Sequence, residues 1–266
     1  PGTKGSDMSM IDPATISPED LQKMMDAFFN RENKNPRDIL YKLTKKAKEE
    51  AGDKPLYYTE WNVGRYDTGY AAAGVLSTLA YNEGLVEGYS YWCISDIFEE
   101  LGLHGLPFNN EFGLVNVYGT PKPVYRVFQA LHSSGSQRLN VSGAPTCKEE
   151  ENAYRTAEIL ALADEDTVTL FAYNHDIEER DIDEVDLEIE LKGNFKKIEK
   201  AVIDREHTNP LGCWKEEVKG AIYPTKAQLA QINAASELVW EDVTNDQNLL
   251  STHMEIESVV IYRITK

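Results

Sequence analysis

A glutamate at the end of a short apolar stretch is the strongest candidate for chemistry in this sequence. Residues 56–59 read Leu-Tyr-Tyr-Thr, framed by Pro55 and a polar loop, so we predict a buried strand that ends at Glu60. Trp61 and Asn62 follow and offer an aromatic surface and a hydrogen-bonding amide. Carboxylates at the carboxyl ends of barrel strands lie in the active-site mouth. Taken alone, a strand-end glutamate is more often the salt-bridge partner of a loop.

A second cluster further along the chain combines aromatic and acidic side chains. Tyr89, Tyr91 and Trp92 fall in an expected strand over residues 86–94, and the acidic sequence SDIFEE follows at residues 95–100. Sugar C–H bonds pack on aromatic faces, and sugar hydroxyls are bound well by charged acceptors. The pattern therefore favours a carbohydrate site built where two strands end.

Four stretches resemble, in order and spacing, the second half of the barrel of glycoside hydrolase family 39. They read PLYYTEWN, SYWCISDIFEELG, LPFNNEFGL and GTPKPVYRVFQAL. Further on, VIDREHTNPLGCWKEEV and PTKAQLAQINAASEL resemble the C-terminal β domain of the same family. The resemblance covers residues 36–266. This family comprises retaining β-xylosidases and, more distantly, α-L-iduronidases.

The resemblance implies roles for individual residues. Glu60 matches the catalytic nucleophile at the end of barrel strand 7, and Trp92 matches the aromatic floor of the sugar subsite on strand 8. Glu100 matches a glutamate that holds sugar hydroxyls, Glu99 is its neighbour, and Asn62 supports the site from behind. The implied substrate is a xylo-oligosaccharide or another β-glycoside, whose terminal β-D-xylosidic bond is hydrolysed. The resemblance implies no cofactor and no metal.

The sequence also departs from the family pattern. Only Val-Gly-Arg-Tyr separates Asn62 from Asp67, where the family has a longer loop, and Asn109-Asn110-Glu111 stands in place of His-Gly-Gly. A retaining glycosidase needs a second carboxyl group as acid/base. The family carries this group in an Asn-Glu-Pro motif on strand 4, and the sequence contains no Asn-Glu-Pro.

These departures leave two hypotheses open. The first is the C-terminal portion of a retaining β-glycosidase, inactive as this chain alone, whose partner is the missing N-terminal barrel half or a second copy of the chain. The second is a non-catalytic carbohydrate-binding or scaffolding remnant, in which Glu60 and Trp92 form a binding patch.

The elements that position these residues change character near Ser134. Before it, we predict strands over 56–60 and 86–94 among helices over 17–30, 36–51, 67–81 and 122–132. After it, twofold alternation predicts antiparallel strands over 157–162, 168–173, 185–191 and 256–264, with one helix over 225–238. The expected fold class is α/β plus all-β. Residues 1–135 form the C-terminal part of a (β/α)8 TIM barrel, with strands 7 and 8, and residues 136–266 form an antiparallel β-sandwich.

Composition narrows the classes of function. The chain has 27 basic and 45 acidic residues, a net charge of −18, so its surface repels a phosphate backbone and nucleic acid is not an expected partner. No apolar run reaches the length of a membrane span, so no membrane partner is expected either. The start PGTKGSD lacks the apolar core of a signal peptide, which favours a cytoplasmic location. Three cysteines without a CxxC pair indicate free thiols rather than disulfides or a zinc site.

Two further groups of residues are better explained by structure than by function. The run from Asp204 to Asn209 contains potential metal ligands, but neighbouring side chains on an extended strand point to opposite faces, so a structural corner is expected. Trp214 is expected to pack against this corner, and Trp240 and Tyr223 are expected in the core or at domain contacts.

Overall fold

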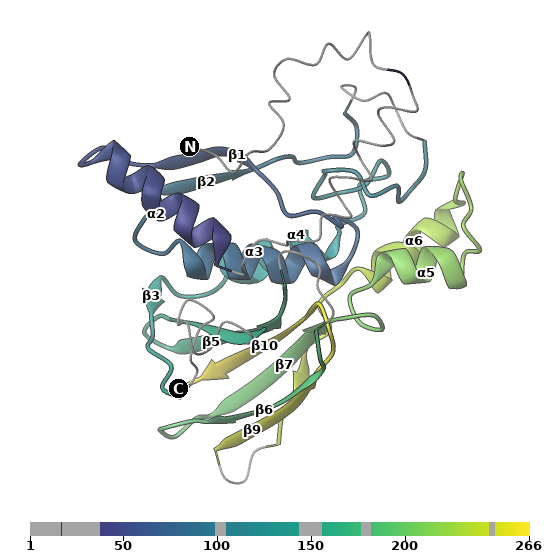
Figure 1. Ribbon diagram of the computed structural model, residues 1–266. Coiled ribbons are helices and arrows are strands. Elements are labelled where there is room, and N and C mark those ends of the chain that lie inside the picture. The colour runs from purple at the N-terminus through teal and green to yellow at the C-terminus, as the bar shows by residue number, and fades with distance from the viewer. Residues whose placement is uncertain (1–16, 18–37, 99–104, 144–155, 177–181, 245–247) are drawn as a thin grey trace. The chain divides into compact units, whose positions relative to one another are not determined.

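Helices and two parallel strands come first along the chain, and antiparallel strands dominate from residue 137 (Figure 1). The computed structural model describes residue 17 and residues 38–98, 105–143, 156–176, 182–244 and 248–266. Residues 37–266 form one compact unit, which contains every helix and strand named below. The helix predicted over 17–30 lies outside the described residues.

The first group of elements holds one two-stranded parallel sheet and three helices. Strand β1 (Tyr57–Trp61) pairs in parallel with β2 (Gly88–Tyr91), and the helices are α2 (Ile39–Ala51), α3 (Gly69–Tyr81) and α4 (Pro123–His132). Local signals explain the helix ends. Thr68 caps α3 by accepting a hydrogen bond from the Tyr70 N–H, α4 begins with a proline, and α2 ends before Gly52. The predictions of these helices and of the parallel strand order are confirmed.

Two predicted burial patterns in this group are wrong. The helical spacing of Ile39, Leu40, Leu43 and Ala47 predicts one buried face of α2. Leu43 is nevertheless 57 % exposed, and the neighbouring Thr44 is buried instead against the Tyr58 hydroxyl. Strand β1 was expected to be buried, yet Tyr57 is 57 % exposed and Thr59 is exposed as well. The reason is that the described helices contact one face of the β1–β2 pair, through Thr44 of α2 and Phe128 of α4.

The second group of elements forms two antiparallel sheets, as predicted. One has six strands in the order β3-β4-β5-β10-β7-β8, and the other pairs β6 with β9. Their bounds are β3 (Gln137–Arg138), β4 (Ala157–Ala163), β5 (Thr167–Asn174), β6 (Val185–Glu190), β7 (Lys197–Ile203), β8 (Glu241–Asp242), β9 (Leu249–Met254) and β10 (Ser258–Thr265). Along β6, acidic residues are exposed and the aliphatic residues between them are covered, which confirms the expected alternation.

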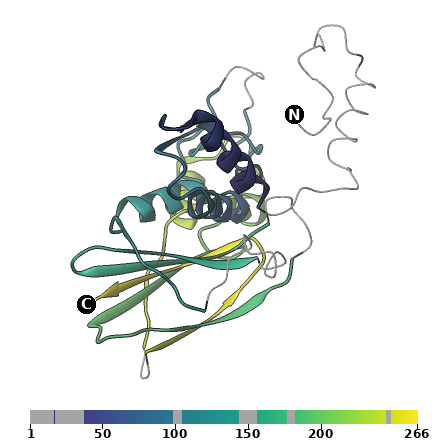
Figure 2. The same cartoon turned by 60° about the vertical axis from the view of Figure 1, so that its left-hand side comes forward.

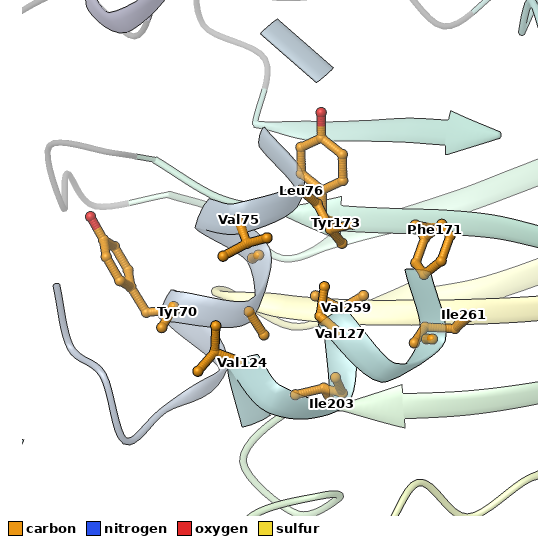
Figure 3. Close-up of a cluster of buried hydrophobic side chains, with 14 of the residues drawn as sticks. Tyr70, Val75, Leu76, Val124, Val127, Phe171, Tyr173, Ile203, Val259 and Ile261 are labelled. Atoms are coloured by element: carbon orange, nitrogen blue, oxygen red, sulfur yellow. The ribbon is translucent and has the colours of Figure 1, made fainter. Parts of the chain in front are cut away.

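Apolar clusters lie on both faces of the six-stranded sheet. Figure 2 shows helices along one face of this sheet. On one face, α3 and α4 pack against β5, β7 and β10; Figure 3 shows Val75, Val127, Phe171, Ile203 and Ile261 meeting there. On the other face, β6 and β9 cover a second cluster. Residues from both sides of Ser134 share the first cluster, and the division of the chain at residue 135 stays a prediction.

A helical hairpin projects beyond the end of β7 (Figure 1). It consists of α5 (Pro210–Glu216) and α6 (Lys226–Ala235), and Trp214 packs on Phe108 with ring centroids 5.8 Å apart. The prediction for Trp240 is confirmed, since it packs on an apolar cluster, whereas the predicted contact of Trp214 with the corner at residues 204–209 stays a prediction. The prediction for Tyr223 is wrong: this residue of the turn between α5 and α6 is 84 % exposed. Within the described residues, no helix is long and apolar enough to cross a membrane.

Candidate active site

A bulge in β1 presents Glu60 at the carboxyl end of the strand. Tyr58 pairs with Tyr89 and Trp61 pairs with Tyr91, so two residues of β1 lie opposite the single residue Ser90. These two residues, Thr59 and Glu60, are both exposed. A bulge of this kind re-aims a side chain relative to the regular alternation of a strand. It turns Glu60 toward the exposed face of the sheet.

Aromatic rings fill the opposite face of the same strand pair. Tyr58 and Tyr89 meet edge to face, as do Trp61 and Tyr91, each with ring centroids 5.5 Å apart. Tyr91 then contacts Phe128 of α4 over 5.4 Å. Edge-to-face pairs of this kind add stability beyond the area that they bury. The backbone that carries Glu60 is therefore anchored to the helices from behind.

Trp92 is held beside Trp61 by main-chain and side-chain hydrogen bonds. The Trp92 N–H donates to the Trp61 carbonyl oxygen over 2.9 Å, and the Asn62 Nδ2–H donates to the Trp92 carbonyl oxygen over 3.2 Å. The Tyr66 hydroxyl lies 3.4 Å from Asn62 Oδ1. The peptide bond between Trp92 and Cys93 is cis. The Asn62 amide thus joins the ends of the two strands, and its role in the site stays a prediction.

The segment after Asn62 is packed tightly on α3 and on the sheet. Val63 is buried, and a Cβ atom on Gly74 would lie only 2.1 Å from the Val63 side chain, so α3 needs glycine at this position. Arg65 pairs with Glu257, before β10, over 2.7 Å. These contacts tie the short loop after β1 to the antiparallel sheet.

A row of rings connects Trp92 with the loop between β2 and α4. Trp92 meets Phe98 at 5.4 Å, Phe98 meets Phe112 at 6.2 Å, and Phe112 meets Tyr66 at 5.2 Å, all with steeply inclined planes. Such a row supplies an apolar wall beside Trp92. Its last member, Tyr66, comes from the loop after β1, so the row joins both strand ends.

Behind this wall lies a buried ionic cluster. The Lys122 ammonium lies 2.7 Å from Asp67 Oδ1 and 2.9 Å from Asp96 Oδ1, and all three side chains are nearly inaccessible. Burial raises the pKa of Asp96 to about 6, while Lys122 acts in the opposite direction. The cluster therefore contains two carboxyl groups and only one ammonium group.

The structure brings together three of the five predicted site residues. Glu60, Asn62 and Trp92 lie at the carboxyl ends of two adjacent parallel strands, whereas Glu99 and Glu100 lie outside the described residues. Within the described part of the chain, no hydrogen bond or ion pair joins the Glu60 side chain to another residue. Sequence reasoning missed Lys122, Asp67 and Asp96 as one cluster, because nothing in their spacing signals that they meet.

Comparison with known proteins places this arrangement in a family. The model of the family described as "Glycosyl hydrolases family 39" matches residues 21–247, most of the chain. The chain belongs to glycosyl hydrolase family 39. Within family 39, it is 36 % identical over 220 residues to a β-xylosidase from Caldicellulosiruptor saccharolyticus; the match covers 79 % of this chain and 43 % of that protein. A β-xylosidase from Geobacillus stearothermophilus is 26 % identical over 171 residues, which cover 61 % of this chain and 31 % of that one.

Solved structures of family 39 share the fold. A β-xylosidase from Caulobacter crescentus superimposes with a TM-score of 0.68 at 21 % identity, over 96 % of this chain and 56 % of that one. The chain therefore spans about half the length, or less, of the relatives that it matches.

Proposed function

We propose that this chain supplies the nucleophile of a retaining β-glycosidase that acts on β-xylosides. The observation that carries the proposal is the bulge in β1, which leaves Glu60 exposed at the carboxyl end of a parallel strand and next to the anchored Trp92. A carboxylate beside an aromatic platform matches the needs of glycoside hydrolysis, in which a carboxylate attacks the anomeric carbon of a bound sugar. The β-xylosidase relatives support xylose as the sugar.

We assign β1 and β2 to strands 7 and 8 of a (β/α)8 barrel. Parallel strands are normally covered on both faces, whereas Tyr57, Thr59 and Ser90 are exposed on the face that carries Glu60. In a closed barrel this face turns to the interior, and the remaining strands cover it. The matched relatives have about twice the length of this chain, enough for those strands.

The proposed reaction needs a group that the Asn-Glu-Pro motif supplies in the family. Glu60 forms a glycosyl ester, while a protonated carboxyl group about 5–5.5 Å away donates its proton to the leaving oxygen and then deprotonates the attacking water. The sequence has no Asn-Glu-Pro, so we assign the acid/base to a polypeptide that carries the first half of the barrel. The alternative, a non-catalytic carbohydrate-binding remnant, predicts that no added polypeptide makes Glu60 necessary for turnover.

The test is a complementation assay on an aryl β-xyloside. The chain is mixed with a polypeptide that contains the Asn-Glu-Pro half of a family 39 barrel, and turnover is compared for Glu60→Ala and Glu87→Ala. Glu87 is a matched control, because it is an exposed glutamate just before β2, at the opposite end of the strand pair. We expect Glu60→Ala to lose about 10³-fold or more of the activity and Glu87→Ala to keep it. Equal activity of the two variants contradicts the proposal.

A further inference from the structure

Lys122 is the most completely buried cation in the described part of the chain, and its ammonium lies close to three oxygen atoms. It forms ion pairs with Asp67 and Asp96, and it donates hydrogen bonds to Asp96 Oδ1 and, over 2.8 Å, to the backbone carbonyl oxygen of Glu111. Its exposed fraction is 0 %. A lysine is almost never buried so fully unless it is paired, so this position has a specific structural task.

The ionic cluster of Lys122, Asp67 and Asp96 forms hydrogen bonds with the backbone on both sides of Phe112. Lys122 binds the carbonyl group of Glu111, and Asp96 Oδ1 accepts the N–H of Gly113 over 2.8 Å. One residue earlier, the N–H of Asn110 donates to Asp67 Oδ2 over 2.7 Å. A Cβ atom on Gly113 would lie 2.3 Å from the backbone nitrogen of Asp96, so the approach of the two segments also requires glycine.

Phe112 connects the segment held by the ionic cluster to Trp92. Its carbonyl oxygen accepts the N–H of Cys93 over 3.2 Å, directly after Trp92, and its ring contacts Phe98, which contacts Trp92. The orientation of the Trp92 ring therefore depends on a segment that the ionic cluster holds in place.

We propose that Lys122 is a positioning residue: by holding the segment 110–113 against Asp67 and Asp96, it sets the orientation of Trp92. The proposal rests on the proposed function only in taking Trp92 as part of the sugar site. Removing the ammonium leaves two buried carboxylates close together without a counter-charge, so they repel each other and release the segment. Trp240 serves as a reference, because the Arg263 guanidinium of β10 covers its ring, 3.9 Å from the centroid.

The experiment observes the four tryptophans of the full chain separately, by ¹⁹F NMR after incorporation of 5-fluorotryptophan. Trp92→Phe assigns the Trp92 resonance. In Lys122→Met we expect this resonance to shift or broaden by more than its linewidth, while that of Trp240 stays in place. Lys42→Met is the control, because Lys42 pairs with Asp38 at the surface of α2, and it should leave all four resonances unchanged. An unchanged Trp92 resonance in a folded Lys122→Met protein overturns the proposal.

If Lys122→Met does not fold, the variant Asp96→Asn tests the proposal instead. Asp96 lies beside Lys122 and Asp67, with Tyr91 and Cys93 close by, and burial raises the pKa of its carboxyl group to about 6. We expect the wild-type Trp92 resonance to move with a midpoint near pH 6, and Asp96→Asn to abolish this movement while the amide oxygen still accepts from Lys122 and Gly113. No movement in the wild type, or the same movement in Asp96→Asn, overturns the proposal. Neither readout requires turnover, so loss of the proposed function leaves this test intact.

Discussion

The main-chain bond from Trp92 to Trp61 locks the residue after Glu60 and the first residue after β2 side by side. The nitrogen and oxygen are 2.9 Å apart, and Asn62 adds a side-chain bond to the carbonyl group of the same tryptophan. Two segments that are distant in sequence are thereby joined at the point where both strands end. The arrangement explains how a short loop after β1 can still hold an aromatic platform beside a carboxylate.

Replacing Asn62 tests the hydrogen bond between its side chain and the Trp92 carbonyl group. Asn62→Ala removes the donor to the Trp92 carbonyl group, and we expect the free energy of unfolding in urea to fall by about 1 kcal/mol, the usual contribution of one such bond. Asn109→Ala is the control, because its amide binds Glu111 at the surface. A loss that is equal in both variants, or absent from both, contradicts a special role for Asn62.

The parallel order of β1 and β2 and the helices around them were predictable, because each element carries its own local signals. Thr68 marks the start of α3, Pro123 the start of α4, and Gly52 the end of α2. The exposure of Tyr57 was not predictable. Its aromatic, β-branched neighbourhood indicates a covered strand, but burial depends on which other strands are present.

The candidate site was predictable only in part, for a different reason. Glu60 lies at the end of β1 and Trp92 follows β2, so their meeting follows from the parallel order. The cluster of Lys122, Asp67 and Asp96 depends on how the loop between β2 and α4 folds back, and no periodic pattern encodes such a loop. Strands β7 and β9 were missed because charged and polar residues interrupt their apolar alternation.

The chain alone should show little or no glycosidase activity. On xylobiose the leaving alkoxide needs a proton, and general acid–base help is typically worth 10²–10⁴-fold in rate. An aryl xyloside has a better leaving group, but Glu60 still lies on an exposed sheet face rather than in a closed pocket. The measurement compares the wild type and Glu60→Ala on both substrates. Glu60-dependent turnover of xylobiose by the purified chain would show that it contains an acid/base, with Glu99 and Glu111 as the first candidates.

Asp96 should give the stability of the chain a defined pH dependence. Burial raises the folded-state pKa from 3.8 to about 6, so the folded state binds the proton more tightly than the unfolded state. The contribution to stability is therefore full below pH 3.8 and is lost as the pH rises through 6, by about 1.4 kcal/mol for each unit of pKa difference. Urea unfolding of wild type and Asp96→Asn at several pH values measures this. A constant difference between pH 4 and pH 7 contradicts the assignment.

His175 should give the stability of the chain the opposite pH dependence. It follows β5 and faces Gly74 of α3, and burial lowers its pKa from 6.5 to about 4. The folded state resists protonation, so this contribution to stability is present above pH 6.5 and is lost as the pH falls toward 4. We expect His175→Phe to gain stability relative to the wild type over that range. His207→Phe, at an exposed histidine, should not; a parallel gain in both variants would count against burial as the cause.

The most direct test of the account is to trap the sugar on Glu60. A 2-deoxy-2-fluoro-β-xyloside with a dinitrophenolate leaving group needs no acid for the first step, and its fluorine slows release of the glycosyl ester. The chain, complemented with the Asn-Glu-Pro barrel half, is incubated with this reagent, digested and analysed by mass spectrometry. We predict one added fluoroxylosyl group on the peptide that contains Glu60, and none in Glu60→Ala. An adduct on a different carboxylate, in a preparation that turns over aryl xylosides, would contradict the assignment of Glu60 as the nucleophile.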